Sequence, residues 1–414
     1  MRWKTTSLFA LIILTLGIKE QSLSMTNLRM ERIVEKWEKG YLTGKWSPDG
    51  RFLFFIRVEK TNEIPACGSL FKVDIRTKKC EPVLKSKIYE SVYFIDMAFS
   101  FDGKYLALEG VDRKSKKLQL WLLNLKNGAM ELLEKEGPDF DFDWSPKENK
   151  IAYSVGFRIP ESTLYIYDVN KREKRLVMKG AASPRFSPNG DWLIFHTYEI
   201  TKWQTDKESG AKIPVEGRFA LNVLDLKTFK KEELLPNFEV TYFLWSPDSR
   251  QIALSVSFTE EVREHLYLLD LGHRHIEKLI ENVAEFGFSS NSQYIACSVF
   301  GPPTTQRREE LSYDIYIIDL KTKGMRKLTS NGSSWFIEFN PKLPNLFVYR
   351  DDSKYFEKGP SFHLRYLDTN LDIPLTPQGS KVNYLVWCTW SPDGRYLAYI
   401  GKGEEIWLAG PLFE

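Results

Sequence analysis

The stretch WSPDGRYLAYIG at residues 390–401 decides the fold, because shorter versions of it recur along the chain. Each version places an aromatic residue before a short polar turn, at Trp46, Phe99, Trp144, Phe186, Trp245, Phe288, Phe339 and Trp390. Successive versions begin 53, 45, 42, 59, 43, 51 and 51 residues apart. Repeats of this length indicate a supersecondary unit that buries its faces only against neighbouring copies.

Each repeat combines turn chemistry with short apolar stretches. In the complete form Ser-Pro-Asp-Gly, proline presets φ, aspartate accepts hydrogen bonds from nearby backbone, and glycine supplies a positive φ. An apolar stretch follows, such as FLFFI at 52–56, and after a loop a second one ends near an aspartate, such as LYIYDV at 164–169. Frequent turns between aromatic and β-branched residues predict short strands, four in each repeat.

We therefore predict an all-β fold, an eight-bladed β-propeller with four-stranded blades, formed as a single domain by residues 25–414. The positions two before each repeated aromatic residue carry no charge, whereas several charges occupy the positions one or three before it. This alternation is typical of an innermost strand with one face packed and the other face toward a central channel.

The last repeat contains only three strand-like stretches, and residues 30–37, MERIVEKW, precede the first repeat. We expect this N-terminal segment to supply the missing strand of the last blade, which would remove an unpaired sheet edge. The alternative is that residues 30–37 form a short amphipathic helix, and that closure uses residues 41–43 or no strand at all.

The first residues differ from the rest of the chain. Arg2 and Lys4 precede the uncharged apolar run SLFALIILTLGI at 7–18, which is too short to span a bilayer comfortably as a helix. Ser22 and Ser24 place small residues at the −3 and −1 positions of a possible signal-peptide cleavage site before Met25. We expect residues 1–24 to be a signal peptide or N-terminal anchor and the protein to be extracytoplasmic (periplasmic, secreted or cell-surface). An uncleaved segment would be the protein's membrane attachment; alternatively, Met25 is the true start.

The repeats resemble the TolB-type β-propeller family, whose WD40-like or PD40 repeats carry W-S-P-D-G followed by an apolar strand and a later strand ending in Asp-Leu. The resemblance covers about residues 40–410. It extends to the propellers of prolyl oligopeptidase-like peptidases, but the G-x-S-x-G motif of their hydrolase domain is absent from this sequence. Because propellers host unrelated functions, the resemblance implies a fold and leaves the role open.

The net charge and the cysteines of the chain bear on nucleic-acid binding and on disulfide pairing. Lys and Arg total 58 against 55 Asp and Glu, a net charge of +3, so we predict no nucleic-acid partner. The four cysteines, Cys67, Cys80, Cys297 and Cys388, show no C-x-x-C spacing. Cys67 and Cys80 are candidates for pairing in an oxidising compartment.

Carboxylates recur on the side of the inner strands expected to face the channel. The stretch DFDFDW at 139–144 places three of them at alternating positions, hence on one side of a strand. The predicted acidic cluster consists of Asp96, Asp139, Asp141, Asp143, Glu285 and Glu338. A structural divalent cation such as Ca²⁺ would relieve their repulsion. We favour a hydrated wall balanced by Lys45 and Arg185, with no cofactor and no metal.

The histidines and the turn aspartates complete the set of chemically active residues. His196, His265 and His363 fall near the loops between second and third strands, where a metal site spanning blades is the alternative to ordinary packing. The aspartates of the turns, Asp49, Asp102, Asp248 and Asp393, are interpreted as turn formers without a catalytic role.

Three longer inserts, at 197–218, 300–312 and 350–361, join second and third strands and should emerge on one face of the disc. They contain side chains of the types that anchor interfaces: Tyr198, Trp203, Arg307, Arg308 and Tyr355. We expect a monomeric, non-enzymatic propeller that binds a protein or peptide partner through this long-loop face and the channel mouth. The alternatives are inserts without a binding role, a hydrolase or lyase with its active site at the channel, or a regulatory propeller partnering a separate peptidase or transporter.

Overall fold

The computed structural model describes residues 28–37, 39, 41–60, 67–89, 91–137, 140–156, 161–205, 212–236, 238–257, 263–301, 312–353, 361–369, 371–375, 387–400 and 405–413. In this part of the chain nearly all regular structure is β-strand, and the exception is the one-turn helix α1 (Ser86–Tyr89). No helix among these residues is long and apolar enough to cross a membrane.

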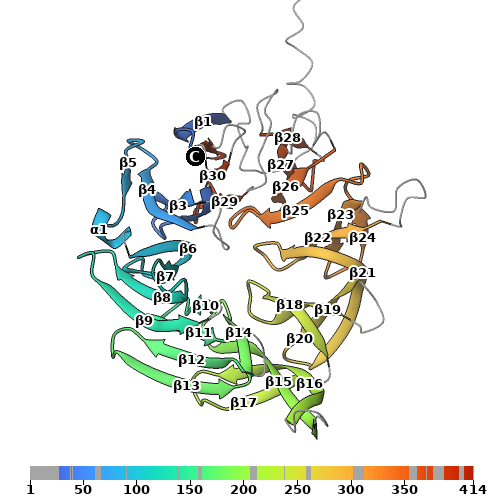
Figure 1. The fold of residues 1–414 in the computed structure, drawn as a ribbon. Helices are drawn as coiled ribbons and strands as arrows, with labels where there is room; N and C mark the ends of the chain where they lie inside the picture. The colour runs from blue at the N-terminus through green and yellow to red at the C-terminus, as the bar shows by residue number, and fades with distance from the viewer. Residues whose placement is uncertain are drawn as a thin grey trace, which may run out of the picture.

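The described strands form eight four-stranded blades around a common axis (Figure 1). Blade 1 contains β2 (Tyr41–Trp46), β3 (Phe52–Lys60), β4 (Cys67–Asp74) and β5 (Cys80–Pro82). Blade 2 contains β6 (Val92–Phe99), β7 (Tyr105–Asp112), β8 (Leu118–Asn124) and β9 (Met130–Gly137). Blade 3 contains β10 (Phe140–Trp144), β11 (Lys150–Val155), β12 (Thr163–Asp168) and β13 (Glu173–Lys179). Blade 4 contains β14 (Ala181–Phe186), β15 (Trp192–Thr205), β16 (Lys212–Asp225) and β17 (Lys231–Pro236). Blade 5 contains β18 (Glu239–Trp245), β19 (Gln251–Ser257), β20 (Glu264–Asp270) and the first half of β21 (His275–Phe288).

The second half of β21 begins blade 6, which continues with β22 (Tyr294–Phe300), β23 (Tyr313–Asp319) and β24 (Met325–Lys327). Blade 7 contains β25 (Ser334–Phe339), β26 (Leu346–Asp351), β27 (Ser361–Tyr366) and β28 (Asp372–Pro374). Blade 8 contains β29 (Cys388–Trp390), β30 (Leu397–Ile400), β31 (Ile406–Gly410) and the N-terminal strand β1 (Arg29–Val34). The predicted eight-bladed architecture is therefore confirmed.

Closure of the ring by the N-terminal segment is also confirmed. Strand β1 pairs antiparallel with β31, with Met30 opposite Ala409 and Val34 opposite Ile406. Ile33 and Val34 are buried in a cluster with Ile406 and residues of blade 1. The two ends of the chain thus share one sheet, and β31 is not left as an open edge.

The repeated turns adopt the predicted geometry. In the first, Ser47 Oγ donates to Asp49 Oδ1 over 2.5 Å, the Phe52 N–H donates to Ser47 Oγ over 2.9 Å, and Gly50 has a φ of 68°. Two turns have serine at the glycine position, and Ser249 and Ser292 have φ values of 63° and 59°. Their hydroxyls accept the N–H groups of Asn189 and Asp248 in the preceding blade, which offsets the cost of the left-handed backbone.

The tryptophans before the turns join neighbouring blades. Trp46 Nε1 donates to Thr389 O over 3.0 Å, Trp144 Nε1 to Ala98 O over 3.0 Å, and Trp245 Nε1 to Arg185 O over 3.2 Å. Each acceptor lies on the inner strand of the blade before. Phenylalanine at the same position in other repeats fills the space but carries no donor. Of the four tryptophans at this position, three therefore hydrogen-bond to the blade before, whereas Trp390 Nε1 has no hydrogen-bond partner among the described residues.

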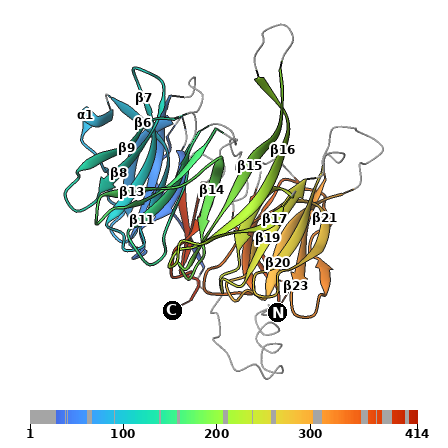
Figure 2. The ribbon, with the colours of Figure 1, turned by 90° about the horizontal axis from the view of Figure 1, so that it is seen from below.

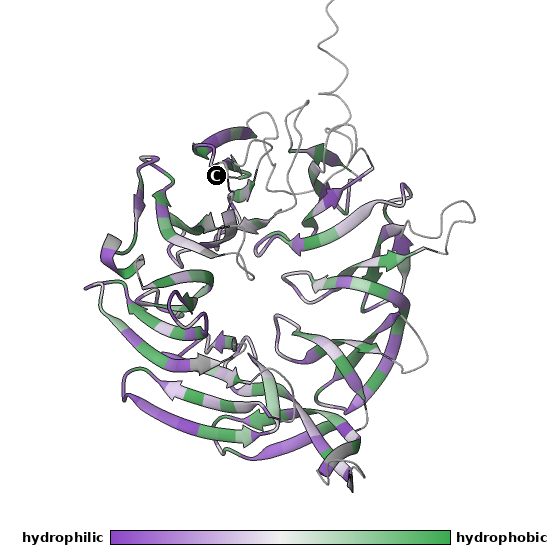
Figure 3. Cartoon of the chain, in the orientation of Figure 1, coloured by the Kyte–Doolittle hydropathy of each residue, from purple (hydrophilic) through white to green (hydrophobic). Residues whose placement is uncertain are grey.

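The hydrophobic core lies between blades. One cluster joins Phe54, Ile56 and Leu70 of blade 1 to Phe94 and Leu106 of blade 2. Apolar residues follow the middle strands, whereas outermost strands such as β13 are largely hydrophilic and exposed (Figure 3). Each blade therefore depends on both neighbours for its burial, as expected of a repeat that cannot fold alone.

The proposed pairing of Cys67 with Cys80 is wrong, since Cys80 is a free thiol. On the paired strands β4 and β5, Cys80 lies opposite Val73, six residues along β4 from Cys67. Six residues of extended strand span about 20 Å, which is far beyond the reach of a disulfide. Cys297 is a buried free cysteine, and burial raises the pKa of its thiol to about 12.

Candidate functional site

The insert of blade 4 is a two-stranded arm and not the loop that the sequence suggested. Strand β15 pairs with β14 only as far as Thr197, and β16 pairs with β17 only from Ala220 onward. Beyond these points the described residues of the two strands pair with each other, with Trp203 opposite Pro214 and Thr205 opposite Lys212, and the Tyr198 N–H still donates to Gly180 O over 3.1 Å. Residues 198–205 and 212–219, called the arm below, project from the disc (Figure 2).

Packing and ion pairs within the arm hold it as a ribbon. The rings of Tyr198 and Phe219 lie 4.7 Å apart between centroids. A Cβ on Gly217 would lie 2.0 Å from Tyr198 Cζ, so glycine lets this ring lie across the strand. Arg218 forms ion pairs with Glu199 at 3.0 Å and with Glu233 of β17 at 2.8 Å, which ties the arm to blade 4.

The arm presents apolar surface to solvent. Trp203 is 53% exposed, and Val215 and Phe219 are also exposed. Of the predicted interface residues, Trp203 therefore lies on an accessible surface, while Tyr198 is half-buried against Gly217. Arg307, Arg308 and Tyr355 lie outside the described residues.

The predicted acidic cluster follows the inner strands around the axis. Asp96 lies on β6, Asp141 and Asp143 on β10, Glu285 on β21 and Glu338 on β25. Asp139 lies outside the described residues. Arg185 of β14 forms an ion pair with Asp141 at 2.6 Å, and the Phe186 N–H donates to Asp143 Oδ2 over 2.7 Å.

Enclosure by the blades controls the charge of this cluster. Burial raises the pKa of Asp143 to about 6, although the Phe186 N–H and Arg185 act in the opposite direction. Burial likewise raises the pKa of Glu338 to about 7, with Lys45 lowering it in part. The pKa values of Asp96 and Glu285 are raised for the same reason. Asp96, Glu285 and Glu338 nevertheless remain exposed and Asp143 is partly exposed, so these carboxyl groups line the axis from several inner strands.

A cavity of about 560 Å³ lies beside this cluster, between the inner strands of blades 5, 6 and 7. Its wall includes Tyr242, which is 47% exposed, together with Phe286, Phe336 and Glu338. The turn residues Pro247, Ser290 and Pro341 also line it. These turns lie at the ends of the strands opposite the arm, so the cavity does not belong to the long-loop face.

The three histidines do not assemble. His196 packs edge-on against Phe243 with 4.7 Å between ring centroids, and burial lowers its pKa to about 4. His265 Nδ1 accepts the N–H of Asn282 at 3.3 Å. His363 is hydrogen-bonded to Asp372 and Ser361 in blade 7. Within the described ranges, no group of three or more His, Cys, Asp or Glu residues is arranged to hold a metal ion.

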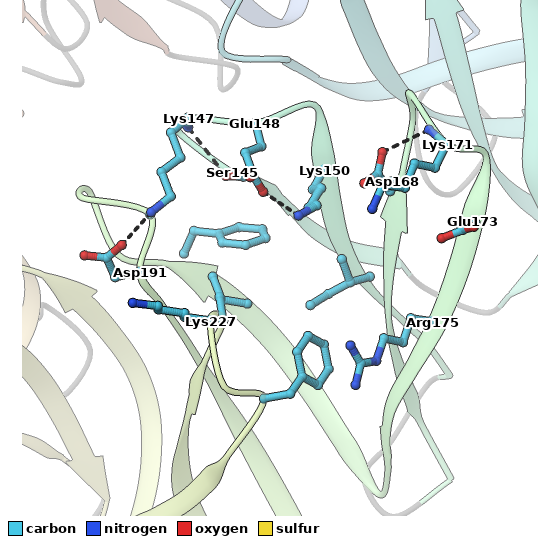
Figure 4. A pocket seen from close by; sticks show the side chains of 15 residues that line it. Ser145, Lys147, Glu148, Lys150, Asp168, Lys171, Glu173, Arg175, Asp191 and Lys227 are labelled. Carbon is cyan, nitrogen blue, oxygen red and sulfur yellow. Dashed lines mark hydrogen bonds and ion pairs between the residues drawn. The ribbon is translucent and has the colours of Figure 1, made fainter.

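A second cavity, of about 410 Å³, lies between blades 3 and 4 on the short-turn face (Figure 4). Five cationic and four acidic side chains line it around Phe186 and Phe229. Lys147 forms an ion pair with Asp191 at 2.5 Å, and the Arg175 guanidinium lies 3.1 Å from the centroid of the Phe229 ring. Similar grooves lie between blades 2 and 3 and between blades 6 and 7, so we attribute this cavity to blade packing.

These features define the chain as a β-propeller. No family model matches it. An uncharacterized protein of Agrobacterium fabrum is 23% identical over 193 residues, which cover 45% of this chain and 62% of that protein, so the match spans less than two thirds of the relative's length.

Several solved structures have similar folds, and two of them illustrate the likeness. Dipeptidyl peptidase 4 of Porphyromonas gingivalis matches with a TM-score of 0.61 and 10% identity, over 88% of this chain and 56% of that chain. An oligogalacturonate lyase in complex with manganese matches with a TM-score of 0.54 and 15% identity, over 91% of this chain and 98% of that chain. At these identities the likeness concerns the fold alone.

Proposed function

We propose that the chain is a TolB-like propeller scaffold that binds a protein partner on its long-loop face, with the arm as the main contact. The observation that carries this proposal is the arm itself, in which β15 and β16 extend beyond their pairing with β14 and β17 and expose Trp203. Aromatic anchors on preorganised elements bind with little loss of conformational entropy.

Most charged side chains of the arm are paired with one another or with blade 4, as expected of a contact surface that is exposed to water when no partner is bound. Lys202 forms an ion pair with Glu216 at 2.5 Å, and Arg218 bridges Glu199 and Glu233. Such pairs discourage unspecific strand addition at exposed edges. They also leave the apolar side chains of the arm as the groups that gain most from burial against a partner.

The test compares two exposed apolar residues on different parts of the disc. Partners captured from the cells that make the protein are identified and purified, and their dissociation constants are measured with wild type, Trp203→Ala and Leu176→Ala. Leu176 is 50% exposed on β13, away from the arm, and serves as the matched control. We expect Trp203→Ala to weaken binding at least about tenfold and Leu176→Ala to leave it unchanged. Equal affinities for all three proteins would refute the proposal.

We further propose that the protein is exported, on the basis of Arg2, Lys4 and the apolar run at 7–18. Mass spectrometry of the mature protein from its native cells tests this directly. A mature N-terminus at Met25 supports export with cleavage. A protein that keeps Met1 and fractionates with the cytoplasm contradicts it.

A further inference from the structure

Blade 7 contains a hydrogen-bonded chain of serine, histidine and aspartate. Ser361 and His363 lie two residues apart on β27 and therefore on the same face of the strand. The distance from Ser361 Oγ to His363 Nε2 is 2.9 Å, and the distance from His363 Nδ1 to Asp372 Oδ1 is 2.7 Å. Asp372 lies on the neighbouring strand β28, where it is opposite Arg365.

The surroundings of Asp372 fix the direction of these hydrogen bonds. Its Oδ2 accepts the hydroxyl of Tyr349 at 2.5 Å and Arg365 Nη1 at 3.1 Å. Although burial raises the pKa of Asp372, the hydrogen bonds from His363 and Tyr349 hold it below its usual value. An ionised carboxylate only accepts, so His363 Nδ1 must be the donor in the pair with Asp372.

This assignment makes Ser361 the donor to the imidazole. When His363 is neutral with its proton on Nδ1, Nε2 is an acceptor, and the partner that faces it is the Ser361 hydroxyl. Among the described residues, the other acceptor near this hydroxyl is Asp351 O, which is farther away at 3.4 Å. The polarity is that of a nucleophile with a general base and an orienting carboxylate.

The position of Ser361 gives it access to a ligand. It is the first residue of β27, opposite Asp351 at the last position of β26, so it lies at the long-loop end of blade 7. Ser361 and His363 are partly exposed, whereas Phe362 and Leu364 on the other face of the strand are buried. The serine is therefore on the same face of the disc as the arm and is not part of the core.

We propose that Ser361 is a nucleophile for the hydrolysis of carboxylic esters, with His363 as its general base and Asp372 as a positioning residue. Ser361 Oγ forms a bond to the ester carbonyl carbon while its proton moves to His363 Nε2. The bond to the alkoxy group then breaks, and the departing oxygen takes that proton and leaves as an alcohol. Water attacks the acyl-serine by the same route and releases the carboxylic acid and free Ser361. Esters are the assigned class because an ester carbonyl is attacked more readily than an amide carbonyl, and an alkoxide is a better leaving group than an amide anion.

In the experiment, the full-length protein is treated with a fluorophosphonate probe, and the labelled residue is located by mass spectrometry. The hydrolysis of p-nitrophenyl acetate is measured in parallel. We expect one phosphonylated serine, Ser361, and ester hydrolysis that Ser361→Ala abolishes. Ser353→Ala is the matched control, because Ser353 follows β26 on the same hairpin and is exposed. This control should retain both labelling and turnover.

The roles of the other two residues have their own readouts. His363→Gln should slow labelling roughly a hundredfold or more, the usual contribution of a general base. Asp372→Asn should lower kcat with KM nearly unchanged, because the carboxylate orients His363 and does not contact substrate. Thermal unfolding of each variant verifies that it is folded. Locating the labelled serine in the wild-type protein tests the proposal even if a variant fails to fold. No labelling of wild type, labelling of a different serine, or equal rates with His363→Gln would overturn the proposal.

Discussion

The tryptophans at the blade junctions allow a matched pair of substitutions. Trp46 and Trp390 occupy the same position of the repeat and are 6% and 5% exposed. Trp46 Nε1 donates to Thr389 O over 3.0 Å, whereas the buried Trp390 Nε1 has no hydrogen-bond partner in the part of the chain that the structure describes. Phenylalanine occurs at the same position in other repeats, so Trp46→Phe and Trp390→Phe fit the architecture.

The two variants should differ by about 2 to 4 kcal/mol in the free energy of unfolding. Both lose a similar amount of buried indole surface, and this loss cancels in the comparison. Trp46→Phe also removes a hydrogen bond that contributes about 1 kcal/mol, while Trp390→Phe removes an unpaired buried N–H that costs about 1 to 3 kcal/mol. We therefore expect Trp46→Phe to be clearly destabilised and Trp390→Phe to be near wild type.

Urea unfolding followed by circular dichroism measures this difference. Trp245→Phe serves as a further control and should behave like Trp46→Phe, because Trp245 donates to Arg185 O. Equal destabilisation at positions 46 and 390 would show that the indoles act only through packing. A larger loss at position 390 would refute the interpretation of these residues as clamps between blades.

Two further predictions concern the axis and the closure. The pKa of Glu338 is about 7 in the folded protein and 4.5 in the unfolded chain, so the folded state binds more protons between these values and is stabilised as pH falls through 7. Glu338→Gln should therefore show a smaller rise in Tm from pH 8 to pH 5.5 than wild type, and an identical pH profile would contradict the raised pKa of this carboxyl. Ile33→Ala should cost about 2 to 4 kcal/mol of unfolding free energy, since Ile33 is buried in the closing strand, whereas Glu31→Ala on the exposed side of β1 should cost little. Similar unfolding midpoints for the two variants would show that β1 does not contribute to closure.

The blade architecture was predictable because its determinants are local. Turn residues and apolar stretches repeat with the period of the blade, and counting strands in the last repeat identified the missing one. The position of Asp141 beside Arg185 also followed from the alternation along inner strands. In contrast, the insert at 197–218 contains many charged residues and two glycines, and its strand character depends on pairing that composition does not reveal.

The other contacts that the sequence did not predict depend on how distant strands are placed relative to one another. Ser361 and His363 are visibly two residues apart, but the contact with Asp372 requires the register of β27 against β28. The clamp by Trp46 requires the relative position of two blades that are separated by almost the whole sequence. Such contacts between distant segments are set by tertiary packing and leave no periodic signal in the chain.

Photocrosslinking in the cells that make the protein most directly tests the claim that the arm contacts a partner. A photoreactive benzoylphenylalanine replaces Trp203 in one version and Leu176 in another. We predict a discrete crosslinked species from position 203 that contains the same partner in every preparation, and none from position 176. The same products from both positions, or no product from position 203, would contradict partner binding by the arm.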